Sequence, residues 1–418
     1  MSMIRLSAPS ARKLRPLRYG QRLIFTRMLA VLLILFSFSI PTVTGAQTMS
    51  PDTILRTLFE TDEPDETRFS PAFLAQVPAS SIAQLLSRLR QSYGALQEIE
   101  ADGDGYQLHF EGADIPAQIV LDQEGRITGL WFGAPVPSGS IEEHAAAITG
   151  LPGAVSLLVL EDGEPLISHN ASEPLAVGSA AKLAILKALA LAVDNGDKQW
   201  PDVVALRPEW KSLPSGSLQD WPDGTPLTLG SLAHFMISIS DNTATDALIR
   251  LVGRDAVEAV SPRNSPFLTT RELFTMKSRE HAGLRLEWAK ADETTRRHIL
   301  ERIAGMPLPS PQALAPEPTY EAAEWFFTAT ELCALLEETS ALPSGSINPG
   351  PVDPGQWRAF SYKGGSETGV LNLSSRVVGA DGIARCVVAT WNHPSALDEN
   401  SLLLPYRGIL DALAGHSQ

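Results

Sequence analysis

One segment constrains the fold of this chain more than any other: the stretch GSAAKLAILKALALAV, residues 178–193, is apolar on nearly every face of the helix that it predicts. Such a helix has to be surrounded by other elements, because no side of it is suited to water. Ser179 and Lys182 stand three residues apart at its start and share a face of the first turn. Burying an ammonium group costs free energy unless something compensates for it. The sequence therefore predicts a domain built around this helix, with an unusual lysine in its interior.

The first 46 residues have the layout of a secretory signal peptide. Seven basic residues and no acidic one lie in the first 27 positions, although the whole chain has a formal net charge of −15. The apolar run MLAVLLILFSFSI follows, and the small residues Thr44 and Ala46 come shortly after it. This order predicts a signal peptide over residues 1–46 and an exported protein, periplasmic or secreted, with an uncleaved N-terminal anchor as the alternative. The run is too short to span a bilayer comfortably, so no stable membrane span is expected after cleavage.

Composition narrows the partners and cofactors that the chain can have. Its acidic body argues against binding to nucleic acid, whose backbone is itself negative. The eight histidines are scattered without an HxxxH or CxxC pairing, so neither a metal site nor another cofactor is expected. The only two cysteines, Cys333 and Cys386, leave open one disulfide or two buried free thiols.

Two structural units are expected after the leader. Residues 50–135 contain two segments of helical periodicity and then three alternating strand-like segments, which is typical of a small α+β domain. Its polar candidates, such as His109 and Asp104, form no recognisable pair, which favours a structural or interaction role. The stretch APVPSGS, residues 134–140, is the expected linker. In residues 141–418, two strands precede a long helical middle, and three strands and a helix follow it. Strands at both ends of such a unit pair into one antiparallel five-stranded sheet beside a helical body, so the fold class is α+β.

Two short motifs carry residues that could catalyse a reaction. A lysine desolvated by neighbouring Leu, Ile and Ala has a lowered pKa, so Lys182 could remove the proton of Ser179 and make it a nucleophile. The alternative is a serine cap followed by a lysine that reaches solvent. The tripeptide Ser240-Asp241-Asn242 opens another helix, where all three residue types are also ordinary N-cap residues.

A third motif, SYKGG, lies at the end of a predicted strand near the C-terminus. Lys363 is followed there by Gly364 and Gly365, which let the backbone approach a ligand closely. The alternative is a glycine turn with a solvated lysine. No G-x-S-x-G elbow and no triad of Ser, His and Asp competes with a lysine-based mechanism.

The order S-x-x-K on a helix, then S-D-N, then K-x-G on a C-terminal strand is the signature of penicillin-binding proteins and class A β-lactamases. From about residue 141 to the C-terminus, the sequence resembles this family of serine hydrolases. The small α+β unit ahead of it resembles the ketosteroid isomerase fold. Together, the two units are most similar to the two-domain hydrolases of clavulanic acid biosynthesis clusters and their relatives.

The resemblance implies a role for each residue of the three motifs. Ser179 would be the acylated nucleophile, Lys182 its base, and Ser240 the relay of a proton to the leaving group. Substrate binding would fall to Asn242, Lys363, Gly365 and Ser366. The resemblance also implies that the backbone N–H groups of Ser179 and Ser366 form the oxyanion hole, and that Lys363 attracts a substrate carboxylate.

Two departures from the family pattern bear on activity. Gly364 stands where the family usually has a hydroxyl residue, so a substrate carboxylate is expected to be bound more weakly or to be bound by Ser366 instead. The E-x-x-L-N loop, whose glutamate activates the deacylating water in class A β-lactamases, is absent. Glu317, Glu321 and Glu324 lie in the right part of the chain, but none is followed by the L-N pattern, and each is interpreted as a helix-start or solvated charge.

The expected function is that of an exported serine hydrolase that acts through an acyl-enzyme on β-lactam-like or ester substrates. Two alternatives remain open at this point. A D,D-peptidase acting on peptidoglycan peptides shares all three motifs. A catalytically silent penicillin-binding module is consistent with the missing glutamate.

Overall fold

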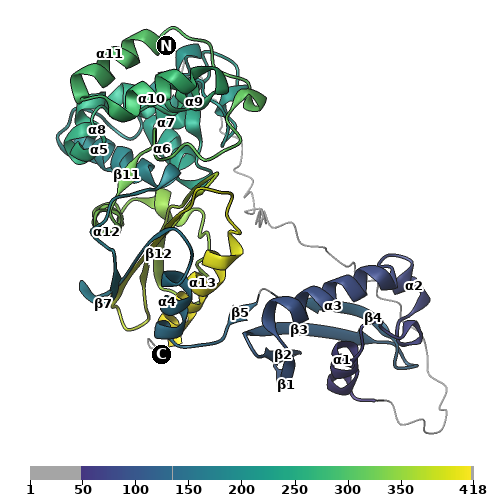
Figure 1. Ribbon diagram of the computed structural model, residues 1–418. Helices are drawn as coiled ribbons and strands as arrows, with labels where there is room; N and C mark the ends of the chain where they lie inside the picture. Colours follow the sequence, from purple (N-terminus) through teal and green to yellow (C-terminus); the bar gives the residue numbers. More distant parts are fainter. Residues whose placement is uncertain (1–48, 134, 416–418) are drawn as a thin grey trace, which may run out of the picture.

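The computed structural model describes residues 49–133 and 135–415 (Figure 1). The predicted signal peptide, residues 1–46, lies outside the described residues. Within the described part, no helix is both long and apolar enough to cross a bilayer.

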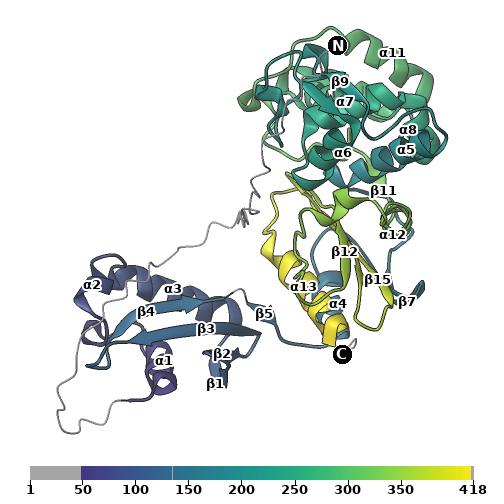
Figure 2. The same cartoon turned by 180° about the vertical axis from the view of Figure 1, so that it is seen from behind.

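The N-terminal unit is a curved antiparallel sheet with helices packed on one face (Figures 1 and 2). The strand order is β1-β2-β3-β4, and apolar side chains such as Ile54, Leu86, Leu108 and Ile115 form its core. Its elements are α1 (Pro51–Glu60), α2 (Pro71–Leu74), α3 (Ala79–Tyr93), β1 (Leu96–Asp102), β2 (Gly105–Phe110), β3 (Ala113–Leu121) and β4 (Ile127–Phe132). The likeness of this unit to ketosteroid isomerase stays a prediction.

Two features of this unit differ from expectation. Strand β1 was not predicted, because its sequence LQEIEAD is rich in charge; as an edge strand it leaves most of its side chains exposed. His109 has a partner after all: its Nδ1 lies 2.7 Å from Asp114 Oδ1, and its Nε2 lies 3.6 Å from Glu100 Oε2. The hydrogen bond to Asp114 raises the pKa of His109.

Part of the predicted linker belongs to the N-terminal sheet. Strand β5 (Val136–Pro137) pairs with β3 and also lies beside α13 (Asn400–Gly415) of the second unit (Figure 1). The chain then enters α4 (Ile141–Thr149) through a capping box formed by Ser140 and Glu143.

The second unit contains the expected antiparallel sheet with a helical body. The strand order is β12-β14-β15-β6-β7, and β13 also pairs with β14. One edge strand is therefore split into two pieces, β12 and β13, at Lys363 and Gly364. The strands are β6 (Ala154–Glu161), β7 (Glu164–His169), β12 (Ala359–Tyr362), β13 (Gly365–Glu367), β14 (Val370–Val378) and β15 (Ala384–Asn392).

Each face of this sheet is covered by helices. Along β15, Val387 and Ala389 pack with α4 and α13, whereas Val388 packs with the helical body on the other face. This alternation is the period of two that a strand buried on both faces requires. The helices of the body are α5 (Lys182–Asp194), α6 (Leu229–Ser238), α7 (Asn242–Val252), α8 (Arg254–Val260), α9 (Thr270–Lys277), α10 (Ala282–Lys290), α11 (Glu293–Ile303) and α12 (Ala329–Glu338). Two short two-stranded sheets accompany them. In one, β8 (Leu175–Ala176) pairs with β11 (Phe326–Phe327), and in the other, β9 (Val203–Ala205) pairs with β10 (Pro226–Thr228).

Helix α5 occupies the centre of the body, as its apolar sequence predicts. Its residues from Lys182 to Leu186 are all buried, as are Ala188 and Leu189. A disulfide between Cys333 on α12 and Cys386 on β15 ties the body to the sheet, which decides between the two states that the sequence left open.

Candidate active site

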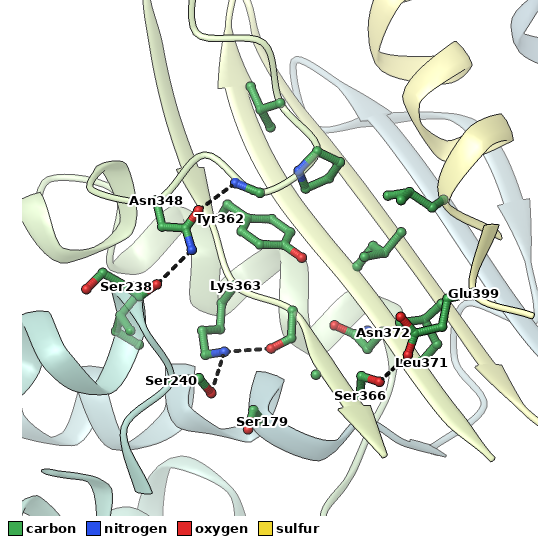
Figure 3. Close-up of a pocket in the computed structure, with 18 of the residues that line it drawn as sticks. Ser179, Ser238, Ser240, Asn348, Tyr362, Lys363, Ser366, Leu371, Asn372 and Glu399 are labelled. Carbon is green, nitrogen blue, oxygen red and sulfur yellow. Dashed lines mark hydrogen bonds between the residues drawn. The ribbon is translucent and has the colours of Figure 1, made fainter. Parts of the chain in front are cut away.

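The three sequence motifs converge on one pocket. Ser179 lies in the 3₁₀ turn η2 (Gly178–Ala181) that leads into α5, Ser240 in the turn between α6 and α7, and Lys363 between β12 and β13. All three line a pocket of about 770 Å³ (Figure 3). Segments about sixty and more than one hundred and eighty residues apart therefore place Ser179, Ser240 and Lys363 at one cavity, as the motif interpretation requires.

Lys182 is buried directly behind Ser179. Its side chain is 2% exposed, and its Nζ lies 3.2 Å from Ser179 Oγ and 2.9 Å from Ser240 Oγ. The same Nζ donates to the backbone oxygen of Ser240 at 2.6 Å and to Asn242 Oδ1 at 2.7 Å. Burial, helped by the positive charge of Lys363, holds the pKa of Lys182 well below its ordinary value.

These contacts determine where the lone pair of an uncharged Lys182 points. The carbonyl oxygen of Ser240 and Oδ1 of Asn242 can only accept, so they take the two hydrogens of a neutral amine. The remaining direction faces the hydroxyl groups of Ser179 and Ser240. A neutral Lys182 can therefore accept the proton of Ser179.

Ser240 is held in an uncommon backbone conformation. Its φ of 58° lies in the left-handed region, which costs free energy for a residue with a side chain. Asp241 fixes the turn around it: Oδ1 accepts from the N–H of Ala244 at 2.8 Å, and Oδ2 accepts from the N–H groups of Ser217 and Leu218. This turn directs both the carbonyl and the hydroxyl of Ser240 toward Lys182.

Lys363 approaches Ser240 from the opposite side. Its Nζ donates to Ser240 Oγ at 3.1 Å and to the carbonyl oxygen of Gly364 at 2.6 Å (Figure 3). Only 4% of Lys363 is exposed, and this burial lowers the pKa of its ammonium to about 7. The hydroxyl of Ser240 therefore lies between two buried lysines, where a proton can pass through it.

Gly365 brings strand β13 against the turn that carries Ser179. A Cβ added at this position would lie 2.0 Å from the carbonyl oxygen of Val177 and 2.5 Å from the backbone nitrogen of Ser179. Only glycine fits there. The next residue, Ser366, is thereby placed beside the first turn of the helix, where backbone N–H groups lack intrahelical partners. The oxyanion hole assigned to Ser179 and Ser366 stays a prediction that this close approach favours.

Asn242 is directed at Lys182 rather than at the cavity. Besides the contact of its Oδ1 with Lys182, its Nδ2 donates to the backbone oxygen of Leu213 at 2.9 Å. Its contact with a substrate amide stays a prediction.

The pocket also contains residues that the motifs did not indicate. The hydroxyl group of Tyr362 lies against Gly364, because a Cβ added at Gly364 would lie 2.3 Å from the hydroxyl oxygen. Ser366 Oγ donates to Glu399 Oε1 at 2.6 Å (Figure 3). Asp353 and Arg407 line the same pocket. The only signal in the sequence was that Tyr362 is part of the segment SYKGG, although no role was assigned to it.

None of the three candidate glutamates lines this pocket. Glu317 and Glu321 are exposed, as expected. The interpretation of Glu324 as a solvated or helix-start charge is wrong, because it is buried and its Oε2 accepts from Lys277 Nζ at 2.5 Å. Lys277 also contacts Glu367 of β13, so Glu324 belongs to a buried ionic cluster.

Comparison with known proteins adds to this picture. Residues 141–295 match the model of a family described as the beta-lactamase enzyme family. This match, together with the mixed arrangement of helices and antiparallel sheet, supports a β-lactamase-like fold and a β-lactamase-like hydrolase for this part of the chain. No curated protein matches the chain.

Several solved structures are similar to about two thirds of the chain. A β-lactamase from Sphaerobacter thermophilus is 24% identical, covers 66% of this chain and 97% of its own length, and has a TM-score of 0.47. The protein PBP-A is 17% identical, with coverage of 66% and 96% and a TM-score of 0.42. A β-lactamase from Chitinophaga pinensis is 16% identical, with coverage of 66% and 98% and a TM-score of 0.41.

Among the described residues, no group of three or more His, Cys, Asp or Glu side chains could hold a metal ion.

Proposed function

We propose that the protein is an exported serine hydrolase that forms an acyl-enzyme at Ser179 on β-lactam-like or ester substrates. The observation that carries this proposal is the environment of Lys182. Two obligate acceptors take its hydrogens, and burial favours its neutral form, so its lone pair faces the Ser179 hydroxyl. A lysine that only stabilised the fold would gain more from a carboxylate partner than from this set of neutral oxygens.

Acylation then follows in balanced steps. Lys182 Nζ accepts the proton of Ser179 Oγ as that oxygen bonds to the substrate carbonyl carbon, and the carbonyl oxygen becomes negative. Backbone N–H groups of Ser179 and Ser366 are proposed to stabilise that charge, each worth about 3 kcal/mol in comparable sites. As the carbonyl reforms, the bond to the leaving group breaks, and Ser240 Oγ passes a proton from the Lys182 ammonium to that group.

Deacylation is expected to be slow. It needs a water attacking the acyl carbon with a base to take its proton, and none of Glu317, Glu321 and Glu324 lines the pocket. Lys182, neutral again after it has given its proton to the leaving group, is the remaining base within reach of Ser179. We therefore favour esters with good leaving groups, or slow turnover of β-lactams.

Export and the role of the small unit are part of the same proposal. The disulfide between Cys333 and Cys386 is typical of oxidising compartments, which supports a periplasmic or secreted location. The N-terminal unit is proposed to be a structural or interaction domain of the ketosteroid isomerase type, as in the two-domain hydrolases of clavulanic acid clusters.

The test is to incubate the purified protein with a β-lactam or a chromogenic acetyl ester and to follow its intact mass and the released chromophore. We expect a mass adduct that is absent in Ser179→Ala and forms far more slowly in Lys182→Met. Lys187→Met, the same change five residues further along α5, is the matched control. If neither compound reacts and no adduct forms, the protein is not this kind of enzyme, and a silent binding module is favoured. An adduct with peptidoglycan peptides alone would instead favour a D,D-peptidase.

A further inference from the structure

The region of the pocket beside β13 is poorly suited to a carboxylate. In the family that the motifs resemble, a lysine and a neighbouring hydroxyl group hold a carboxylate at this position. Here Gly364 has no side chain, and the space is limited by the Tyr362 hydroxyl. Lys363 already donates to Ser240 Oγ and to the carbonyl oxygen of Gly364, so at most one of its hydrogens remains for a ligand.

The second hydroxyl of this region is already engaged. Ser366 Oγ donates its single hydrogen to Glu399 Oε1 at 2.6 Å, so it can offer a ligand only lone pairs (Figure 3). A carboxylate placed at the Ser366 side chain would therefore meet the negative charge of Glu399 and would receive no hydrogen bond from the Ser366 hydroxyl.

The charge of Glu399 extends across this part of the cavity. Besides burial, it raises the pKa of the Tyr362 hydroxyl, which stays protonated. Asp353 is a second carboxylate in the lining. Arg407 is a cation in the same lining, so the inference concerns the place beside Ser366 and Glu399 and not the whole pocket.

We propose that this pocket selects acyl substrates that present a hydrogen-bond donor, best of all an ammonium group, to Glu399 and Ser366, and that it disfavours substrates with a carboxylate there. This inference rests on the proposed acyl-enzyme function at Ser179. Glu399 Oε2 and the lone pairs of Ser366 Oγ accept from the donor group, while the ester carbonyl lies at Ser179.

The experiment compares three esters of the same leaving group and similar length. The para-nitrophenyl esters of β-alanine, butyric acid and succinic acid (as the monoester) carry an ammonium, a methyl and a carboxylate at corresponding positions. At one fixed pH near neutrality, kcat/KM is measured for each after subtraction of spontaneous hydrolysis. We expect the β-alanine ester to exceed the succinate ester by about three- to ten-fold, the range of a partly exposed charge pair.

The variant Glu399→Gln identifies the source of this preference. We expect it to bring the ratio of the two charged esters close to one, whereas Glu317→Gln, the same change at an exposed glutamate outside the pocket, keeps the wild-type ratio. If the wild type prefers the succinate ester, or if Glu399→Gln keeps the ratio, the inference is overturned although Ser179 is still acylated. If Ser179 reacts with none of the esters, the proposed function itself fails, and the inference fails with it.

Discussion

The buried amine of Lys182 lies 2.6 Å from the carbonyl oxygen of Ser240, a residue whose backbone adopts a left-handed conformation. Without that conformation, the turn between α6 and α7 would direct its carbonyl elsewhere, and Lys182 would lose one of its two obligate acceptors. The strained backbone conformation of Ser240 thus helps to orient the amine of Lys182.

This relationship predicts that Ser240→Gly impairs activity without lowering stability. Glycine adopts the left-handed region freely, so the free energy of unfolding should rise by about 0.5–1 kcal/mol or stay level. Loss of the hydroxyl removes the proposed proton relay, which should slow acylation by about 100-fold. Thermal unfolding and the rate of adduct formation measure the two effects. Normal acylation by Ser240→Gly would exclude the relay.

Stability should rise with pH between about 8 and about 10. Burial lowers the pKa of Lys363 to about 7, whereas an unfolded lysine titrates near about 10.4. In this window, the unfolded chain binds more protons than the folded one, so the free energy of unfolding increases with pH by at most about 1.4 kcal/mol per unit for this lysine. Denaturant unfolding at several pH values measures the slope. Lys363→Met should reduce it relative to Lys187→Met, and an equal slope in both variants contradicts the buried ammonium.

The close approach of β13 to η2 predicts that Gly365→Ala impairs catalysis. The added Cβ would overlap the carbonyl oxygen of Val177 and the nitrogen of Ser179, so β13 must move away. We expect acylation to slow by about 100-fold or more if the oxyanion hole is formed here. Gly283→Ala is the control, since a Cβ at that position of α10 meets nothing within 4 Å. Unchanged acylation in Gly365→Ala would show that the proposed hole does not include β13.

The disulfide should contribute substantially to stability. It joins cysteines that are 53 residues apart, and closing a loop of that length in the unfolded chain is worth on the order of 2–4 kcal/mol. The double variant Cys333→Ala/Cys386→Ala should therefore melt at a clearly lower temperature than the oxidised protein. A reductant should lower the melting temperature of the wild type but not of the variant. If the double variant melts at the same temperature as the oxidised wild type, the disulfide does not contribute to stability.

Much of the fold of the second unit follows from local sequence patterns. Alternating apolar runs predicted all five segments of the main sheet, and the three motifs meet at one cavity as the resemblance implied. The strand pattern depends on neighbouring residues, which the sequence displays directly, whereas the meeting of the motifs was expected only from the resemblance. Strand β1 was missed because its charged residues face solvent from an edge.

The residues that escaped prediction depend on distant partners. Glu324 is buried because Lys277, 47 residues earlier, neutralises it. Glu399, just before α13, lines the pocket beside β13, where Ser366, 33 residues earlier, donates to it. No local pattern distinguishes such a glutamate from a solvated one, and the roles assigned to the motif residues stay predictions until the variants above are measured.

The bridge between α12 and β15 has one more consequence. The Pro- and Gly-rich stretch 341–355 and the third motif both lie between Cys333 and Cys386. A protease that cuts one peptide bond in that stretch would leave two fragments still held by the sulfur–sulfur bond, with Lys363 on one and Ser179 on the other. A nicked molecule would thus keep all the parts of its pocket on a single covalent entity, and would come apart only on reduction.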